Sequence, residues 1–218
     1  MSGSRPSRSA ASVRRREAIL GVARELIIER GVDKVVIADV AERADVSVAT
    51  IYNLIGTRDR LLIALLDDVA EQVRTRLGQG SARSGVDACL HVIATACGTV
   101  LDDADMVRAI LANVGNAAPD QWLADGLESS IRRSVDAAIA GGELGVELSS
   151  VAVANGIQLG FRGALISWVF GLLPDERLTA SAEYMTLHVL ANAATPGIRP
   201  EIDQRLVHLA IHLTGASP

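Results

Sequence analysis

The chain has 218 residues, 49% of them hydrophobic, and a formal net charge of −5 at pH 7. This length is enough for one or two domains with a sizeable core, and the apolar content excludes a largely disordered protein. The charge is unevenly divided, with a net of +3 over residues 1–60 and −8 over the remainder. A mildly basic end on an acidic body is typical of a protein that meets nucleic acid at one end only.

Residues 1–13 form a basic, Ser-rich segment without the apolar stretch of a secretory signal, and we expect them to be disordered. A cluster of three cations follows, Arg14, Arg15 and Arg16. Such an arm can follow the minor groove of DNA, or it can simply be solvated. The sequence leaves both interpretations open.

The most informative segment is 37–61, IADVAERADVSVATIYNLIGTRDRL. It predicts a short helix that opens at Asp39, a tight turn at Asp45 and a second short helix over Val48–Leu54 with Ser47 as its N-cap. A unit of this kind seats its second helix in the major groove of DNA. An ordinary helical hairpin with no DNA role is the alternative.

The second helix is predicted to have an inward and an outward face. Its apolar contacts to neighbouring helices are assigned to Val46, Ile51 and Ile55, while Thr57 is expected to cap the next helix. The side chains predicted to face outward, as candidate DNA contacts, are Ser47, Val48, Ala49, Thr50 and Asn53.

From about Arg14 to Leu66, the chain resembles the tetracycline-repressor (TetR) family of bacterial transcription regulators. The resemblance is carried by ILGVARELIIERGVDKV, DVAERADVS and TIYNLIGTRDRLL. It implies a three-helix DNA-binding head, a helical ligand-binding body, and a homodimer that represses transcription until a small molecule binds. It also implies DNA contacts by Thr50, Tyr52 and Arg58, with the Tyr52 hydroxyl on a phosphate. Thr57 is a further candidate DNA contact.

Four positions depart from the family pattern. Val36 stands where a Thr or Ser is usual, Val48 where a polar residue is frequent, Ile55 where an aromatic ring is usual, and Asp45 where a Gly is usual. Each departure removes a phosphate contact, a packing ring or a flexible turn residue. They bear on operator affinity more than on the fold.

From Leu61 on, helical segments alternate with breaks rich in Gly and Pro, and no segment alternates as a strand does. We therefore predict an all-α protein, with an N-terminal three-helix helix-turn-helix head followed by a larger helical ligand-binding and dimerisation body. The predicted domains are a disordered tail over 1–13, a DNA-binding domain over 14–60 and an effector-binding and dimerisation domain over 61–218.

Two residue pairs are candidates for a chemical role. Cys89 and Cys97 are eight apart on one predicted helix, too far to bridge, so we expect small core residues in a reduced, cytoplasmic protein; redox sensing is the alternative. His208 and His212 have a spacing that zinc can use, but no Cys or carboxylate completes a site. We expect no cofactor.

The apolar segment 149–173 is long enough to span a membrane, but Asn155, Gln158 and Arg162 near its middle argue against insertion. Small residues recur along one side of the helix, which permits close approach of another helix. We predict a dimer face on that side, with packing inside one subunit as the alternative. Its residues are Ala152, Gly156, Gly160, Gly163 and Ser167.

The resemblance places an effector among the middle helices, over about residues 86–170. The candidate polar anchors are Asn113, Asn116, Trp122, Gln158 and Arg162. No Ser-His-Asp order, phosphate loop or metal-ligand set stands out, so we do not expect an enzyme. The sequence favours a homodimeric, effector-responsive repressor of a partly palindromic operator. An architectural DNA-binding protein without an effector, or an α-helical enzyme, is the alternative.

Overall fold

A computed structural model describes residues 8–79, 85–114, 124–145, 147 and 149–215 of the chain. In this part of the chain the regular structure is helical, and the only strand-like pairing is an isolated bridge between Leu144 and Ala194. The predicted all-α class is confirmed. The elements are α1 (Arg8–Arg30), the 3₁₀ turn η1 (Val32–Lys34), α2 (Ile37–Arg43), α3 (Val48–Leu54), α4 (Arg58–Gln79), α5 (Gly85–Asp102), α6 (Ala104–Val114), α7 (Ala124–Ala140), α8 (Ser150–Val169), α9 (Asp175–Ala193) and α10 (Arg199–Thr214).

The chain divides into two compact units. The first comprises Met1–Asp68 and Asp105–Pro119, and the second comprises Val69–Ala104 and Asp120–Pro218. The helix α4 contributes residues to both units and runs through residue 60. The boundary that we placed there stays a prediction.

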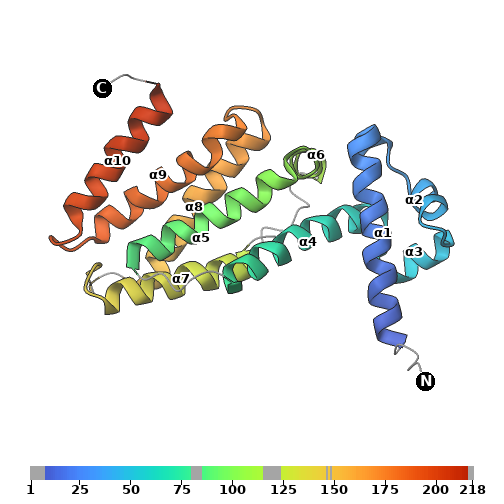
Figure 1. The fold of residues 1–218 in the computed structure, drawn as a ribbon, viewed down its shortest axis with the longest axis horizontal. Coiled ribbons are helices and arrows are strands. Elements are labelled where there is room, and N and C mark those ends of the chain that lie inside the picture. The colour runs from blue at the N-terminus through green and yellow to red at the C-terminus, as the bar shows by residue number, and fades with distance from the viewer. Residues whose placement is uncertain (1–7, 80–84, 115–123, 146, 148, 216–218) are drawn as a thin grey trace. The chain divides into compact units, whose positions relative to one another are not determined.

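In the first unit, α1, α2 and α3 pack on one another, as Figure 1 shows. Their shared core is aliphatic and closely packed. Its fully or nearly fully buried side chains include Ile19, Ala23, Leu26, Val40, Ala41 and Ile51.

Two helix starts differ from the prediction. The helix α1 begins at Arg8, so residues 8–13 are helical although we expected disorder through residue 13. Arg8, Ala10 and Ala11 have high intrinsic helix propensity and lead into the run Arg14–Arg16, which favours this extension despite Ser9, Ser12 and Val13. The helix α2 begins at Ile37 and not at Asp39, with Val36 as an N-cap that supplies no side-chain hydrogen bond.

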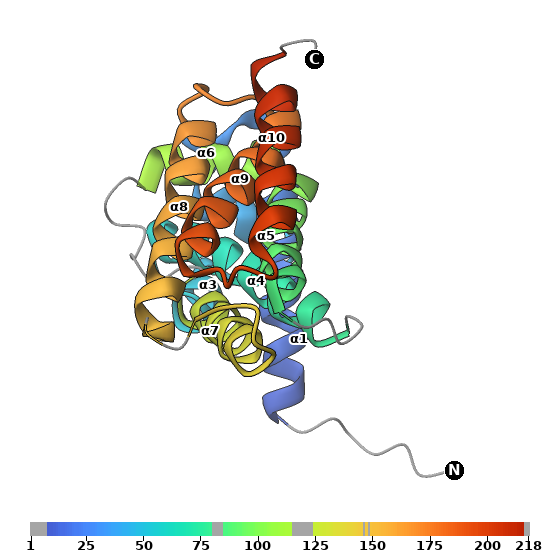
Figure 2. The same ribbon diagram turned by 90° about the vertical axis from the view of Figure 1, so that its left-hand side faces the viewer.

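In the second unit, α9 packs on α5, α8 and α10, while α7 packs on α5 and α8 (Figures 1 and 2). The helix α5 is the only described helix that is long and apolar enough to cross a membrane by length and composition. Ten of its residues are buried, and it packs on two neighbouring helices, as the core helix of a folded domain does.

Three connections fix the ends of helices in the second unit. The Nε1 of Trp168, at the end of α8, donates to Asp175 at the start of α9 over 2.8 Å. The carboxylate of Glu143 accepts from the backbone N–H of Val86 in the first turn of α5, at 2.7 Å. The N–H of Thr195 donates to the Glu143 carbonyl over 2.9 Å, which ties the end of α9 to the α7–α8 loop.

Candidate nucleic-acid interface

The helix α3 has the predicted bounds and the predicted cap. The Ser47 hydroxyl accepts a hydrogen bond from the Thr50 backbone N–H at 3.1 Å and lies 2.8 Å from the Thr50 hydroxyl. One amide that the helix start leaves without a partner is therefore satisfied. Ile51 is completely buried and anchors this seven-residue helix to its neighbours.

The turn before α3 has a left-handed residue. Asp45 has a φ of 51° and is the only described non-glycine residue with a positive φ. The Val46 N–H donates to the Ala41 carbonyl over 3.0 Å and closes the turn. Asp adopts this conformation at a lower cost than most residues, which explains how the turn forms without the glycine usual at this position.

The outward face of α3 is accessible as predicted. Ser47, Val48, Ala49 and Asn53 are exposed, and Thr50 is half-buried. Tyr52 is 54% exposed, and its hydroxyl has no hydrogen-bond partner among the described residues. Thr57 is exposed, and its hydroxyl accepts from the Arg60 backbone N–H over 3.4 Å, so it caps α4 only weakly.

Arg58 is turned back into its own unit. Its Nε donates to the Val35 carbonyl at 2.9 Å, and its Nη2 donates to the Val32 carbonyl at 2.6 Å. The guanidinium thereby ties the start of α4 to η1 and the segment that leads into α2. Arg58 as a DNA contact stays a prediction, but its observed hydrogen bonds have a structural role.

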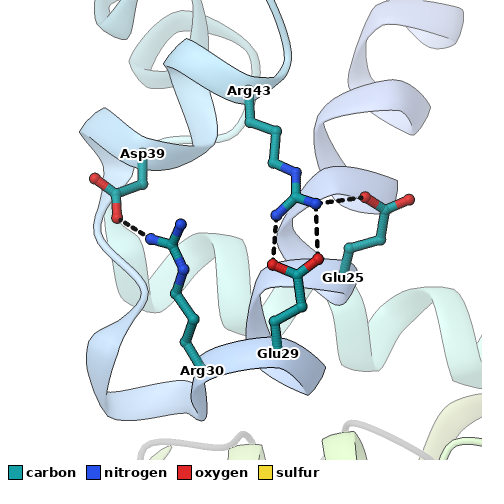
Figure 3. Close-up of polar contacts among 5 residues, drawn as sticks. All are labelled: Glu25, Glu29, Arg30, Asp39 and Arg43. Atoms are coloured by element: carbon teal, nitrogen blue, oxygen red, sulfur yellow. Dashed lines mark hydrogen bonds and ion pairs between the residues drawn. The ribbon is translucent and has the colours of Figure 1, made fainter.

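Ion pairs join α1 to α2 (Figure 3). The Arg43 guanidinium donates with both terminal nitrogens to Glu29, at 2.6 and 2.7 Å, and lies 3.9 Å from Glu25. Arg30 pairs with Asp39 at 2.9 Å. The hydrogen bond from Arg43 lowers the pKa of the Glu29 carboxyl, and Glu29 raises the pKa of Arg43 in turn. These pairs hold α2 in place and neutralise two of the head's cations.

Five cations of the first unit have no ion-pair partner among the described residues. They are Arg14, Arg15, Arg16, Lys34 and Arg60. Three of them project from the first turns of α1, where the sequence suggested an arm. Lys34 and Arg60 were not among our candidates, because only the structure shows which cations are already neutralised.

The N-terminal part of α1, with Arg15, lies beside the outward side of α3. A hollow of about 400 Å³ lies between the two helices. It is lined by Ala11, Ser12, Arg15, Thr50, Asn53 and Leu54. Sequence reasoning missed Ala11 and Ser12, although the four-residue spacing of Ala11 and Arg15 would place them on one face of a helix extended toward the N-terminus.

The predicted effector anchors that the structure describes belong to different units. Asn113 is exposed on α6 in the first unit, whereas Gln158 is half-buried and Arg162 is exposed on α8 in the second unit. Asn116 and Trp122 lie outside the described residues. The anchor assignments stay predictions.

The small residues of α8 divide into two sets. An added Cβ would lie 3.1 Å from a Val189 methyl at Gly156 and 2.9 Å from the Met185 Cβ at Gly160, so both glycines permit close packing on α9 of the same chain. Ala152 and Gly163 are exposed, and the half-buried Ser167 donates to the Gly163 carbonyl over 2.8 Å. The intrasubunit alternative accounts for the two glycines, and the dimer face stays a prediction.

The two cysteines are core residues. Both are completely buried, and loss of water raises the pKa of each thiol to about 12. A thiol of this kind is a poor nucleophile at neutral pH.

Comparison with known proteins agrees with this geometry. A family model described as "Bacterial regulatory proteins, tetR family" matches residues 19–65, which include α2 and α3. Residues 19–65 are therefore similar to the DNA-binding domain of the tetR family. The HTH-type transcriptional regulator LuxR of Vibrio harveyi is 35% identical over 68 residues, and the match spans 31% of this chain and 33% of LuxR.

Two solved structures share the fold of most of the chain. RolR without ligand is 23% identical, with a TM-score of 0.60 over 86% of this chain and 96% of RolR. CprB from S. coelicolor A3(2), a TetR family protein, is 16% identical, with a TM-score of 0.61 over 90% of this chain and 97% of CprB. At these identities the likeness shows a common fold.

Proposed function

We propose that this tetR-family regulator is a homodimeric repressor whose heads bind a partly palindromic operator and are released by a small, largely apolar effector. The observation that carries the proposal is the α3 surface. A capped helix, anchored by a fully buried Ile51, presents Thr50 and Asn53 outward beside Arg15, which pairs with no carboxylate in the described part of the chain. Polar side chains on such a helix read base edges, while cations and hydroxyls bind phosphates.

Phosphate contacts are assigned to the groups that the fold leaves without partners. The Tyr52 hydroxyl and the guanidinium of Arg15 can each reach a phosphate without giving up a hydrogen bond or an ion pair inside the protein. By contrast, Ser47 accepts from the Thr50 N–H and Arg58 donates to two carbonyls, so both side chains already have a structural role in the head. We therefore expect Arg15 and Tyr52 to contribute more to DNA affinity than Ser47 and Arg58.

The dimer is proposed from the exposed face of α8. Leu159, Ile166 and Phe170 are 67%, 53% and 69% exposed, and their spacing of seven and four residues places them on one side of the helix. Exposed apolar side chains that gather on one face mark an interaction site. In a homodimer, the two α3 helices would then read half-sites about 34 Å apart or near that spacing.

The effector is proposed from the helical body. RolR, whose fold this chain shares, has been solved in complex with the ligand resorcinol. A ligand of this kind would release DNA only by binding more tightly to the form whose heads are wrongly spaced, because equal affinity for both forms shifts nothing. Such a regulator would work in the cytoplasm.

The test is selection of bound sites from random duplexes with the full chain, followed by fluorescence anisotropy at several salt concentrations. We expect a two-fold related motif and an affinity that falls steeply with salt, because phosphate contacts release counterions. Arg15→Ala is expected to lower, by about 1, the slope of the logarithm of the DNA-binding constant against the logarithm of the salt concentration. Tyr52→Phe is expected to weaken DNA binding at every salt concentration.

The matched control is Arg132→Ala, which removes another exposed cation, on α7, and should leave the salt dependence of DNA binding unchanged. Selection that yields no motif would overturn operator recognition. A motif whose binding no metabolite mixture alters would leave an architectural DNA-binding protein as the better description.

A further inference from the structure

A cavity of about 340 Å³ lies among α5, α9 and α10 in the second unit. This volume is at the lower end of the range of about 300–1,000 Å³ found for ligand pockets. Its lining is part apolar and part charged. The lining residues are Leu90, Glu183, Leu187, Gln204, Arg205, His208 and Leu209.

The arrangement of three helices explains why space remains here. The helix α9 packs on both α5 and α10, and the three helices lie near one another in Figure 2. Leu90 comes from α5, Glu183 and Leu187 come from α9, and the other lining residues come from α10. Arg205 of α10 pairs with Asp87 of α5 at 2.7 Å, and this ion pair links α10 to α5.

The charges at the cavity do not balance. Arg205 donates to Asp87 and also to Glu201, at 2.6 Å, so its guanidinium is shared between two carboxylates. Glu183 has no hydrogen bond or ion pair among the described residues. The Arg205 guanidinium therefore pairs with two carboxylates, while Glu183 lines the cavity and pairs with neither Arg205 nor another described cation.

Glu183 is also withdrawn from water. It is half-buried on α9, and this burial raises the pKa of its carboxyl, while the charge of Arg205 lowers it. A half-buried carboxylate costs free energy unless a cation or hydrogen-bond donor satisfies it. The cavity thus offers one unsatisfied anion beside the apolar side chains of Leu90, Leu187 and Leu209.

We propose that this cavity is a binding site for a small organic cation, a primary ammonium group on a short apolar chain. The ammonium would pair with Glu183, and the chain would cover Leu90, Leu187 and Leu209. Because the site lies on α5, α9 and α10 and involves none of the DNA-contacting residues, the inference does not depend on DNA binding, and its test contains no DNA.

The test is isothermal titration calorimetry of the full chain at pH 7.5 with n-hexylamine, hexan-1-ol and hexanoate. These three probes share one alkyl chain and differ in charge, and the amine is protonated at this pH as a lysine side chain is. We expect one hexylammonium per chain, with at least tenfold weaker binding of the alcohol and the carboxylate.

Two variants locate the site. Glu183→Gln keeps the shape and removes the charge, and we expect at least tenfold weaker binding of hexylammonium. Glu176→Gln removes an exposed carboxylate from the first turn of the same helix and should leave binding unchanged. Leu209→Trp should abolish binding by filling the cavity, with circular dichroism as the check that each variant is folded.

Three results would overturn the proposal. Hexylammonium that does not bind the wild-type chain would exclude an ammonium site. Equal affinity for the amine and the alcohol would mean an apolar crevice without charge selection. Undiminished binding by both Glu183→Gln and Leu209→Trp would place the bound cation elsewhere on the protein.

Discussion

Arg58 shows how one side chain can join three segments. Its two hydrogen bonds to the carbonyls of Val32 and Val35 connect the start of α4 to the turn between α1 and α2. Lysine carries the same charge on a single nitrogen at the end of a flexible stem, so it lacks the two nitrogens at fixed spacing that reach the two carbonyls. The geometry of the guanidinium, and not its charge alone, is what the head requires.

We therefore expect Arg58→Lys to lower the free energy of unfolding of the head by about 1–2 kcal/mol, the range for hydrogen bonds from a charged group that is partly exposed. Urea denaturation followed by circular dichroism measures this change. Arg60→Lys is the matched control, since the Arg60 guanidinium has no partner among the described residues. Equal stability of both variants would contradict the structural role of Arg58.

At this scale the sequence predicts local chemistry well. The Ser47 cap and the left-handed Asp45 could be predicted because both depend on residues within a few positions in the chain. The role of Arg58 could not, because its partners are carbonyls 23 and 26 residues earlier, which any residue type could supply. The same holds for Glu183, which has no partner among the described residues because of how α9 and α10 pack near α5, a helix far away in the sequence.

Among the elements, α2 depends on its ion pairs with α1. The helix has seven residues and no side-chain N-cap, so it is too short to be stable alone. The pair between Arg43 and Glu29 is solvent-exposed, and salt therefore weakens it. Its contribution is expected to depend on both pH and ionic strength.

Glu29→Gln is expected to destabilise the head at neutral pH and low salt. Because pairing lowers the pKa of Glu29 from its usual value of 4.5, this contribution is present above 4.5 and is lost as the pH falls through the lowered pKa of the folded state. Thermal unfolding of wild type and variant across pH measures the difference. Glu42→Gln is the control, because Glu42 is an exposed carboxylate of α2 without an ion pair among the described residues. If wild type and Glu29→Gln still differ in stability below the pKa of Glu29 in the folded state, the ion pair is not the cause.

The helix α8 permits a comparison between two of its glycines. Gly163 has open space where a Cβ would stand, so Gly163→Ala should raise the free energy of unfolding by about 1 kcal/mol through helix propensity. At Gly160 the Cβ would lie 2.9 Å from the Met185 Cβ, and Gly160→Ala should be net destabilising by about 1 kcal/mol through overpacking. Urea denaturation of the two variants, side by side, is the measurement. A stabilising Gly160→Ala would mean that the α8–α9 crossing is not tight.

The sequence predicts that the elements are helices, but it does not predict every helix boundary or every contact between helices. Gly and Pro breaks place the helices of the body, because these residues terminate helices wherever they occur. The start of α1 was placed too late, because a basic, Ser-rich composition suggested disorder where Ala and Arg sustain a helix. The small residues of α8 predicted a close helix crossing, but periodicity alone does not say whether the other helix belongs to the same chain.

For the whole molecule, the exposed apolar residues of α8 lead to a prediction about assembly. If Leu159 and Ile166 are buried between two copies, a charge placed there would be desolvated at a cost that the interface cannot offset. We expect Ile166→Glu to be monomeric at micromolar concentration, with the wild-type chain dimeric, by size-exclusion chromatography with light scattering.

Ile28→Glu is the matched control. Ile28 is 65% exposed on α1 in the first unit, so its replacement should leave the dimer intact. A dimeric Ile166→Glu variant would instead locate the interface on another surface. If both variants are monomeric, residues of the head also contribute to the dimer interface.

The reactivity of the two buried cysteines can be used to measure how often the second unit opens. Both belong to α5, which packs on α7 and α9, and the pKa of each thiol is about 12. A thiol reagent can therefore react only when the second unit opens, so the rate of modification reports how often that opening occurs. An alkylammonium held among α5, α9 and α10 would slow the reaction at Cys89 and Cys97, although it touches neither sulfur.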